Sequence, residues 1–90
     1  MPHLLMQLKI KDFDAWKPVY DEHDAERVAH GQLSARVFQS ADDPNSVVIL
    51  QEWKDAEGFQ KFYTSDTFRE AVQRAGVMGP PDRLVLREVT

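Results

Sequence analysis

The sequence predicts a single α+β domain, and three observations support this prediction. Ninety residues are too few to build two hydrophobic cores, so residues 1–90 form one domain. Strand-type alternation and helix-type periodicity follow one another in the order strand, helix, strand, strand, helix, strand. Apolar side chains occupy both faces of the expected strands, which indicates that both faces of the sheet are covered.

The first strand and the first helix are defined by alternation and by helix caps. Residues 3–10 alternate, and one face of this strand carries four apolar side chains, Leu4, Met6, Leu8 and Ile10. Asp12 is an N-cap residue for a helix that continues to about His30. Gly31 follows as the C′ residue, because glycine readily adopts the left-handed conformation that ends many helices.

The remainder of the chain repeats this pattern. Three more strands are expected over residues 33–40, 47–53 and 83–89. The second helix begins after Asp55, is interrupted at Ser65, which caps a new helical segment, and ends at Gly76. The order βαββαβ with right-handed crossovers predicts a ferredoxin-like fold, in which a four-stranded antiparallel sheet carries both helices on one face.

The helices cover only one face of this sheet, so the other face needs a partner. Leu5, Val48 and Leu50 lie opposite the main apolar sets of their strands. An exposed apolar sheet is an aggregation hazard, and we therefore expect a second copy to pack sheet against sheet in a two-fold homodimer. We expect this homodimer core to be formed by the drier face of the first strand, which carries Leu4, Met6, Leu8 and Ile10.

Two segments add a family resemblance that extends over nearly the whole chain. They are the strand end VILQEWKD at residues 48–55 and the helical segment FYTSDTF at residues 62–68. With the βαββαβ order, they resemble the dimeric α+β barrel superfamily, which includes antibiotic-biosynthesis monooxygenase-like proteins and small polyketide cyclases. The family often has the helical pattern His-x-x-Ser-x-His-Phe, and here Phe62 and Thr67 stand at the two histidine positions. In its heme-degrading branch, a helix histidine holds the iron.

The resemblance implies a pocket between the helices and the sheet of each protomer, with no metal or flavin in most members. It also implies cofactor-independent cyclisation or oxygenation, if the protein is an enzyme. We therefore expect no cofactor.

The first helix carries the candidate site. One stripe of this helix, at spacings of three and four residues, consists of Phe13, Trp16, Tyr20, His23, Arg27 and His30. An aromatic wall with a few converging polar groups is typical of a small-molecule pocket. The alternative is that these side chains bury their stems and extend their polar tips into water. His23 is the candidate acid or base, because histidine exchanges protons near neutral pH, unless it is simply a hydrogen-bonded structural residue.

Polar residues also occur within the strands. Gln7 and Gln51 are expected on the two central strands, where they either bind a ligand on the helix side or set the register of the dimer. We favour the helix side for both. Arg36, like Arg27, is a candidate to stabilise an enolate or phenolate.

Aromatic residues gather at the third strand's end and in the broken helix, and these are Trp53, Phe59, Phe62, Tyr63 and Phe68. Most are expected to be core residues. The alternative is that they form a second pocket wall that opens at the helix break over residues 64–66 or at the loop over residues 76–81.

Composition excludes several other functions. A net charge of −4 argues against nucleic acids and anionic membranes as partners, and the absence of cysteine excludes disulfides and thiolate metal sites. Acidic and histidine residues at helical spacing, namely Glu22, His23, Glu26 and His30, suit a divalent ion, but such faces are usually just solvated, so we predict no metal site. Without a membrane span or secretory signal, the expected location is the cytoplasm.

The sequence therefore predicts a protein that binds a small apolar, aromatic or polyketide-like molecule, and two alternatives remain for its role. In one, it is a cofactor-independent cyclase or monooxygenase in which His23 moves a proton, and Gln7, Trp16, Tyr20, Gln51, Trp53, Phe62 and Phe68 contact the ligand. In the other, it is a non-catalytic structural or stress-related accessory dimer. A helix–sheet cavity of roughly a few hundred Å³, lined by Trp16, His23 and Trp53, would favour the first, and a filled core would favour the second.

Overall fold

The computed structural model describes residues 2–79 and 81–89 and has the predicted order of elements. Each of the two expected helices is a pair of shorter ones. The elements are β1 (His3–Lys9), α1 (Phe13–Glu22), α2 (Asp24–Ala29), β2 (Gln32–Gln39), β3 (Ser46–Trp53), α3 (Ala56–Tyr63), α4 (Asp66–Ala75) and β4 (Asp82–Leu86). Pro80, within the loop expected to open the pocket, lies outside the described residues.

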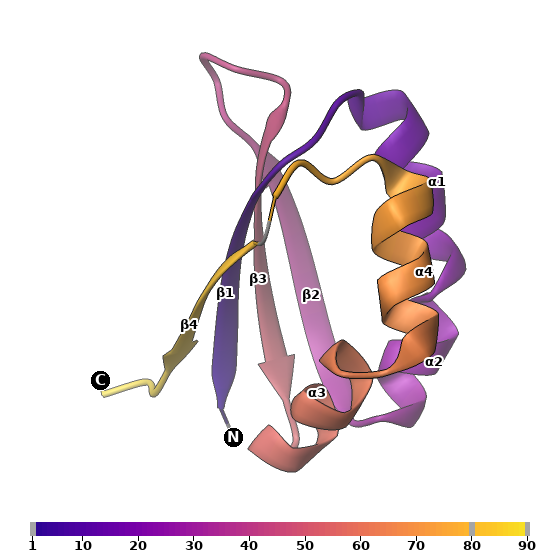
Figure 1. Cartoon of the computed structure of the whole chain (residues 1–90). Helices are drawn as coiled ribbons and strands as arrows, with labels where there is room; N and C mark the ends of the chain where they lie inside the picture. Colours follow the sequence, from indigo (N-terminus) through magenta and orange to yellow (C-terminus); the bar gives the residue numbers. More distant parts are fainter. Residues whose placement is uncertain (1, 80, 90) are drawn as a thin grey trace.

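The four strands form one antiparallel sheet in the order β2-β3-β1-β4. All four helices lie on one side of it, with α1 and α4 side by side (Figure 1). This arrangement confirms the ferredoxin-like α+β fold. The last strand ends at Leu86, earlier than the expected residue 89. Among the described residues, no helix has both the length and the apolar character needed to cross a membrane.

Helix starts follow the predicted caps. The Asp12 carboxylate accepts the amide of Asp14 at the start of α1, and the Asp55 carboxylate accepts the amide of Gly58 at the start of α3. Ser65 Oγ accepts the amide of Phe68 at the start of α4, so the predicted interruption of the second helix is confirmed. These caps orient α3 and α4 over the sheet.

The interruption at His23 was not predicted, and the expectation of one continuous first helix is wrong there. His23 has φ −98° and ψ 10°, and its amide lies 3.3 Å from the Tyr20 carbonyl, a contact of the tighter 3₁₀ type. The imidazole Nδ1 lies 2.9 Å from the carbonyl oxygen of Val19. The imidazole thus occupies the carbonyl to which the amide of His23 itself would donate in a continuous α-helix, and that amide lies against the Tyr20 carbonyl instead, which is a physical reason for the break.

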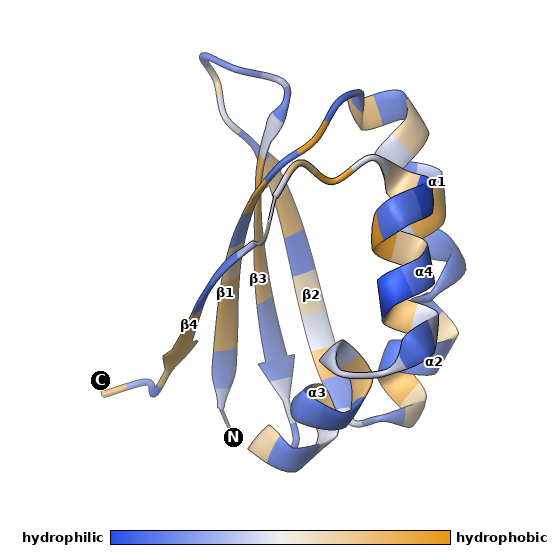
Figure 2. Cartoon of the chain, in the orientation of Figure 1, coloured by the Kyte–Doolittle hydropathy of each residue, from blue (hydrophilic) through white to orange (hydrophobic). Residues whose placement is uncertain are grey.

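The expectation for the two faces of β1 is wrong, because the face expected at the dimer core is the one that the helices cover. Leu4, Met6, Leu8 and Ile10 face the helices and are buried, so they form the protomer core and not a dimer core. Figure 2 shows polar bands alternating with apolar ones on α1 and α4, and apolar residues recurring along β1 and β3. The aromatic stripes of the helices pack against this driest face, since that arrangement removes most apolar surface from water.

The outer face of the sheet keeps a row of apolar side chains. Leu5 pairs with Leu50 on one side and with Leu84 on the other, and Leu84 is 57% exposed. Phe38 and Leu86 extend this outer face and are also exposed. The chain by itself therefore leaves apolar surface in water on the face that carries no helix.

Candidate functional site

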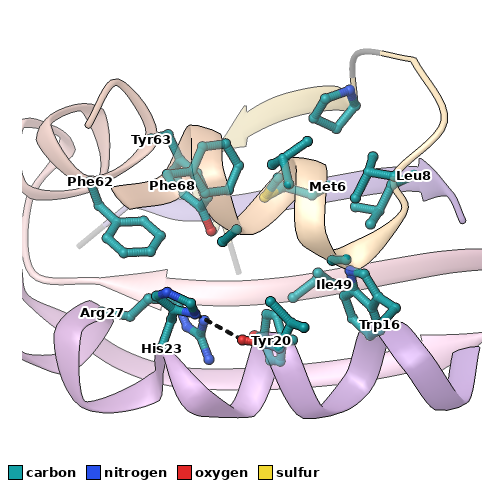
Figure 3. A pocket seen from close by; sticks show the side chains of 16 residues that line it. Met6, Leu8, Trp16, Tyr20, His23, Arg27, Ile49, Phe62, Tyr63 and Phe68 are labelled. Carbon is teal, nitrogen blue, oxygen red and sulfur yellow. Dashed lines mark hydrogen bonds between the residues drawn. The ribbon is translucent and has the colours of Figure 1, made fainter. Parts of the chain in front are cut away.

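A small cavity lies between the helical layer and the sheet. It encloses about 60 Å³ and is lined by residues of β1, α1, α2, β3, α3 and α4, with Val77 and Pro81 from the segment before β4. Apolar and aromatic side chains make up most of its wall. His23 contributes an imidazole to the cavity wall and Arg27 contributes a guanidinium group. Both side chains project from the α1–α2 side, opposite Phe62 and Phe68 (Figure 3).

The α1–α2 wall is a stack of flat groups. Trp16 and Tyr20 stack with ring centroids 5.0 Å apart and an interplanar angle of 25°. The guanidinium carbon of Arg27 lies 3.8 Å from the centre of the Tyr20 ring. Tyr20 follows Trp16 by four positions and Arg27 follows Tyr20 by seven, about one and two helical turns, so the helical repeat aligns them into one wall.

His23 is held in a defined orientation on this wall. Its Nδ1 lies 2.9 Å from the Val19 carbonyl oxygen, which can only accept a hydrogen bond, so Nδ1 carries the proton and donates. In the neutral ring, Nε2 is then the nitrogen with a free lone pair. His23 is half-buried and lines the cavity. The arrangement provides a positioned proton acceptor beside an apolar space.

Arg27 is unusual because it is a buried cation with free donors. It is 3% exposed, and its Nε and Nη2 atoms are buried without a hydrogen-bond partner among the described residues. The carboxylate of Asp24 is 3.6 Å from Nη2, beyond hydrogen-bond distance, and this carboxylate is mostly exposed. Buried charged groups ordinarily have close partners.

A buried hydrogen-bond network lies beneath the cavity. Gln51 Oε1 accepts hydrogen bonds from Trp53 Nε1 and from the Tyr63 hydroxyl, both at 2.9 Å. Gln51 Nε2 donates to the Tyr20 hydroxyl at 3.4 Å. Burial raises the pKa of the Tyr63 phenol well above its usual range, so this hydroxyl stays protonated. The network fixes the side chains that support both walls.

The α3–α4 wall consists of aromatic side chains. Phe62 and Tyr63 meet edge to face at 5.0 Å, and Tyr63 and Phe68 do so at 4.7 Å. Phe62, Tyr63 and Phe68 all line the cavity. This wall presents aromatic side chains to the cavity, whereas the α1–α2 wall also presents an imidazole and a guanidinium group.

Comparison with known proteins identifies the family. Residues 6–74 match the family described as antibiotic biosynthesis monooxygenase. The chain belongs to this family. A solved antibiotic biosynthesis monooxygenase is 21% identical, with all of both chains covered and a TM-score of 0.76. SnoaB, a cofactor-independent oxygenase from Streptomyces nogalater, has a TM-score of 0.81 at 12% identity, with 99% of this chain and 93% of SnoaB covered. At these identities, the likeness shows the fold.

A curated relative from Natronomonas pharaonis is named as a heme-binding protein. It is 37% identical over 43 residues, which are 48% of this chain and 7% of that protein. The chain therefore spans a small fraction of that relative's length.

The residues of this family member do not supply the helix histidine with which the heme-degrading branch holds iron. At those two positions, Phe62 is buried in the aromatic wall and Thr67 is exposed on α4. Within residues 2–79 and 81–89, no three His, Cys, Asp or Glu side chains are arranged to hold a metal ion.

The structure brings together some of the sequence-predicted site residues and separates others. Six of them line the cavity, namely Trp16, Tyr20, His23, Arg27, Phe62 and Phe68. Gln51 lies on the helix side, as expected, but in the network beneath the cavity. Trp53 is fully buried and donates to Gln51, so it supports the cavity without lining it.

Two expected site residues lie on the outer face of the sheet, so the expected position of Gln7 on the helix side is wrong, and Arg36 lies away from the cavity. Gln7 pairs with Val48 and is exposed on the side away from the helices. Arg36 pairs with Leu50, and its guanidinium lies 5.2 Å from the Phe38 ring on the same outer face. Alternation separates the two faces of a strand, but it does not say which face the helices cover.

Other lining residues were missed for the same reason. Met6 and Leu8 line the cavity, although they were expected at a dimer core. The sequence pattern places Tyr63 only in the aromatic cluster. Phe62 and Tyr63 are adjacent in the chain, and adjacency does not indicate that both side chains reach the cavity, as they do. His30, the last member of the helix stripe, lies instead beside a polar cleft with Asp55 and Lys61.

Proposed function

We propose that this chain binds a small, largely apolar, aromatic or polyketide-like molecule between the α1–α2 wall and the sheet, and oxygenates it without a cofactor. The observation that carries the proposal is His23. Its Nδ1 is anchored to the Val19 carbonyl, so its Nε2 is a basic nitrogen within an aromatic cavity wall. The family of the chain and the cofactor-independent activity named for SnoaB support the same reaction class.

The proposed chemistry needs only a proton acceptor and an apolar space. His23 Nε2 takes a proton from an acidic CH₂ group beside an aromatic ketone, which leaves a delocalised carbanion. Molecular oxygen then accepts electrons from this carbanion. One oxygen atom enters the substrate as a new carbonyl, and the other leaves as water with the two hydrogens of the CH₂ group. The stacked Trp16 and Tyr20 rings hold the flat substrate against His23.

A ligand of this size requires the cavity to open. A volume of about 60 Å³ is well below the roughly 300–1,000 Å³ of pockets that hold ligands of this size. Glu22 of α1 and Arg74 of α4 form an ion pair with Arg74 Nη2 3.3 Å from Glu22 Oε2, and both side chains are more than half exposed. Such surface ion pairs contribute little to stability, so they offer little resistance to separation of the helices. Pro81, at the end of the loop over residues 76–81 that the sequence predicts as an opening, lines the cavity.

A direct test is the oxidation of anthrone, an aromatic ketone with an acidic CH₂ group, to anthraquinone. We expect oxygen uptake and anthraquinone formation above the uncatalysed rate in chelator-treated buffer. His23→Ala should lower the enzymatic rate at least about tenfold. His30→Ala is the matched control, because its Nδ1 makes the same contact with a backbone carbonyl four residues back, 2.8 Å from Glu26 O, but it does not line the cavity. Equal losses in both variants would contradict a role for His23 in proton transfer.

A cyclase and a non-catalytic accessory dimer are the other candidate functions. The cavity volume of about 60 Å³ favours the accessory dimer, because it is well below the volume of a ligand pocket, roughly a few hundred Å³. Oxygen uptake separates the candidates, because a cyclase converts substrate without it, and an accessory dimer neither converts nor binds the probe.

We further propose that the outer face of the sheet pairs with a second copy. The row of Leu84, Leu5 and Leu50 crosses three strands, and a two-fold axis would bring it against itself. Leu50→Glu should convert the dimer to a destabilised monomer in sedimentation experiments at micromolar concentration. Val28→Glu places the same charge at an exposed apolar site on α2 and should leave the dimer intact. A wild-type monomer would contradict this proposal.

A further inference from the structure

We propose that Arg27 makes this cavity prefer ligands that carry a carboxylate, so that an aromatic acid binds more tightly than a neutral aromatic molecule of the same shape. This inference rests on the proposed function, since it assigns a chemical class to the ligand of the same cavity. Its starting point is a guanidinium that is almost fully buried and yet has two unpaired donor atoms, Nε and Nη2.

The positions of the unpaired donors define what they can bind. In a guanidinium group, the N–H of Nε and one N–H of Nη2 point in the same direction along one edge. This edge matches the two oxygens of a carboxylate, which accept two parallel hydrogen bonds. The face of the same group is already occupied by the Tyr20 ring at 3.8 Å. The free edge therefore suits a planar, two-oxygen anion.

The protein itself leaves this edge without a strong counter-ion. Asp24 is the acidic group paired with Arg27, and its Oδ1 is 3.6 Å from Nη2, with the side chain 65% exposed. Because the Asp24 carboxylate is largely in water and lies beyond hydrogen-bond distance, it is a weak partner for the buried Arg27. Burying a cation with unpaired donors costs free energy, and an anionic ligand would recover that cost on binding.

The relation between Arg27 and His23 fits one ligand across both. These residues are four positions apart and line the same cavity, with Tyr20 against Arg27 and Trp16 against Tyr20. A carboxylate on Arg27 would place the aromatic body of the ligand along the Tyr20–Trp16 stack, with His23 beside it. Arg27 would then position the ligand, while His23 takes the proton.

The test compares two probes of nearly the same shape, 2-naphthoate and 2-naphthamide. The first is ionised at pH 7, as carboxylic acids are, and the second is neutral. We expect calorimetric titration of the wild-type protein to show at least tenfold tighter binding of 2-naphthoate. Arg27→Met should abolish this preference while retaining binding of 2-naphthamide. Arg27→Lys keeps the charge without the two-donor edge, and it should retain only part of the preference.

Two further variants separate a specific edge from general charge. Arg69→Met removes a positive charge from an arginine whose side chain is 72% exposed on α4, and the preference for 2-naphthoate should persist. Asp24→Asn removes the competing carboxylate, and it should tighten binding of 2-naphthoate without affecting 2-naphthamide.

The outcomes distinguish this inference from the proposed function. Equal binding of both probes by the wild type would overturn the carboxylate selectivity and leave a neutral-ligand cavity intact. A preference for 2-naphthoate that survives in Arg27→Met would also overturn it, because the anion would then be recognised elsewhere. Failure of both probes to bind at millimolar concentration would contradict both the selectivity and the ligand cavity.

Discussion

The two helical walls of the cavity are both interrupted helices, but they are built for different purposes. Between α3 and α4, the break has a regular cap, in which Ser65 accepts the Phe68 amide, and the buried side chains are aromatic. Between α1 and α2, no side chain caps the start of α2, and the imidazole of His23 bonds backward to Val19 instead. The buried member of α2 is a cation, Arg27.

This difference indicates where stability and chemistry lie. The α3–α4 wall consists of well-packed rings whose contacts favour folding, whereas the α1–α2 wall keeps polar atoms without partners. Local departures from regular structure and unpaired buried groups tend to occur at functional sites. Substitutions on the first wall should therefore mainly affect unfolding, and those on the second should mainly affect binding.

The largest effect is expected from truncating the aromatic wall. Phe62 is 2% exposed and contacts the rings of Trp53, Tyr63 and Phe68. Phe62→Ala should lower the free energy of unfolding by about 3–5 kcal/mol, measured by denaturant titration, because it leaves a cavity within the core. Thr67→Ala, at an exposed position of α4, should change it by less than about 0.5 kcal/mol. A loss below about 1 kcal/mol for Phe62→Ala would show that this wall is loosely packed.

The next effect concerns the network that links the walls. Gln51→Leu should cost about 2–4 kcal/mol of stability, because the donors of Trp53 and Tyr63 would both be buried without acceptors. Tyr63→Phe removes only one hydrogen bond and should cost about 1 kcal/mol. The double variant should lose less than the sum of the two, since the substitutions share a partner. Additive losses would mean that Gln51 and Tyr63 act independently.

A smaller effect is expected in alkaline solution. Burial raises the pKa of the Tyr63 phenol, so the folded chain keeps this proton when the unfolded chain releases it near pH 10. The stabilisation is complete below that pH and is lost above it, by up to about 1.4 kcal/mol per pH unit. Chemical unfolding from about pH 9 to about pH 11 should show this slope as the difference between wild type and Tyr63→Phe. Parallel profiles would indicate that the hydroxyl reaches water.

The smallest effect on folding is expected on the α1–α2 wall. His23→Ala should change the free energy of unfolding by less than about 1 kcal/mol, because it removes one hydrogen bond to a backbone carbonyl. Thermal melting and probe binding on the same sample separate the two roles. A large loss of stability with binding per folded molecule intact would make His23 structural.

The sequence was sufficient for the fold because its local signals agree with one another. Asp12, Asp55 and Ser65 begin helices as caps, and Gly76, with φ +74°, ends α4. The break at His23 had no such signal, since it depends on a side-chain bond to Val19 that no residue pattern specifies. Propensity and capping describe where helices begin and end, but not how a side chain disturbs one in the middle.

The candidate site was only partly predictable. Spacing placed Trp16, Tyr20, His23 and Arg27 on one stripe, and all four line the cavity. The position of the two glutamines could not be predicted. Both faces of β1 and β3 carry apolar residues, so the sequence pattern does not say which face the helices cover. Gln51 is on the inner face and Gln7 on the outer. The burial of Arg27 depends on packing against Tyr20, which spacing alone does not reveal.

The central claim is that the α1–α2 wall is the ligand-binding wall, and nitrogen-detected side-chain and backbone NMR during titration with 2-naphthoate tests it most directly. We predict that the largest shifts occur at Trp16, His23 and Arg27, with the Nε–H signal of Arg27 moving downfield as it acquires a hydrogen-bond acceptor. Shifts confined to the outer face around Leu5, or to the polar cleft around Lys61, would contradict the claim.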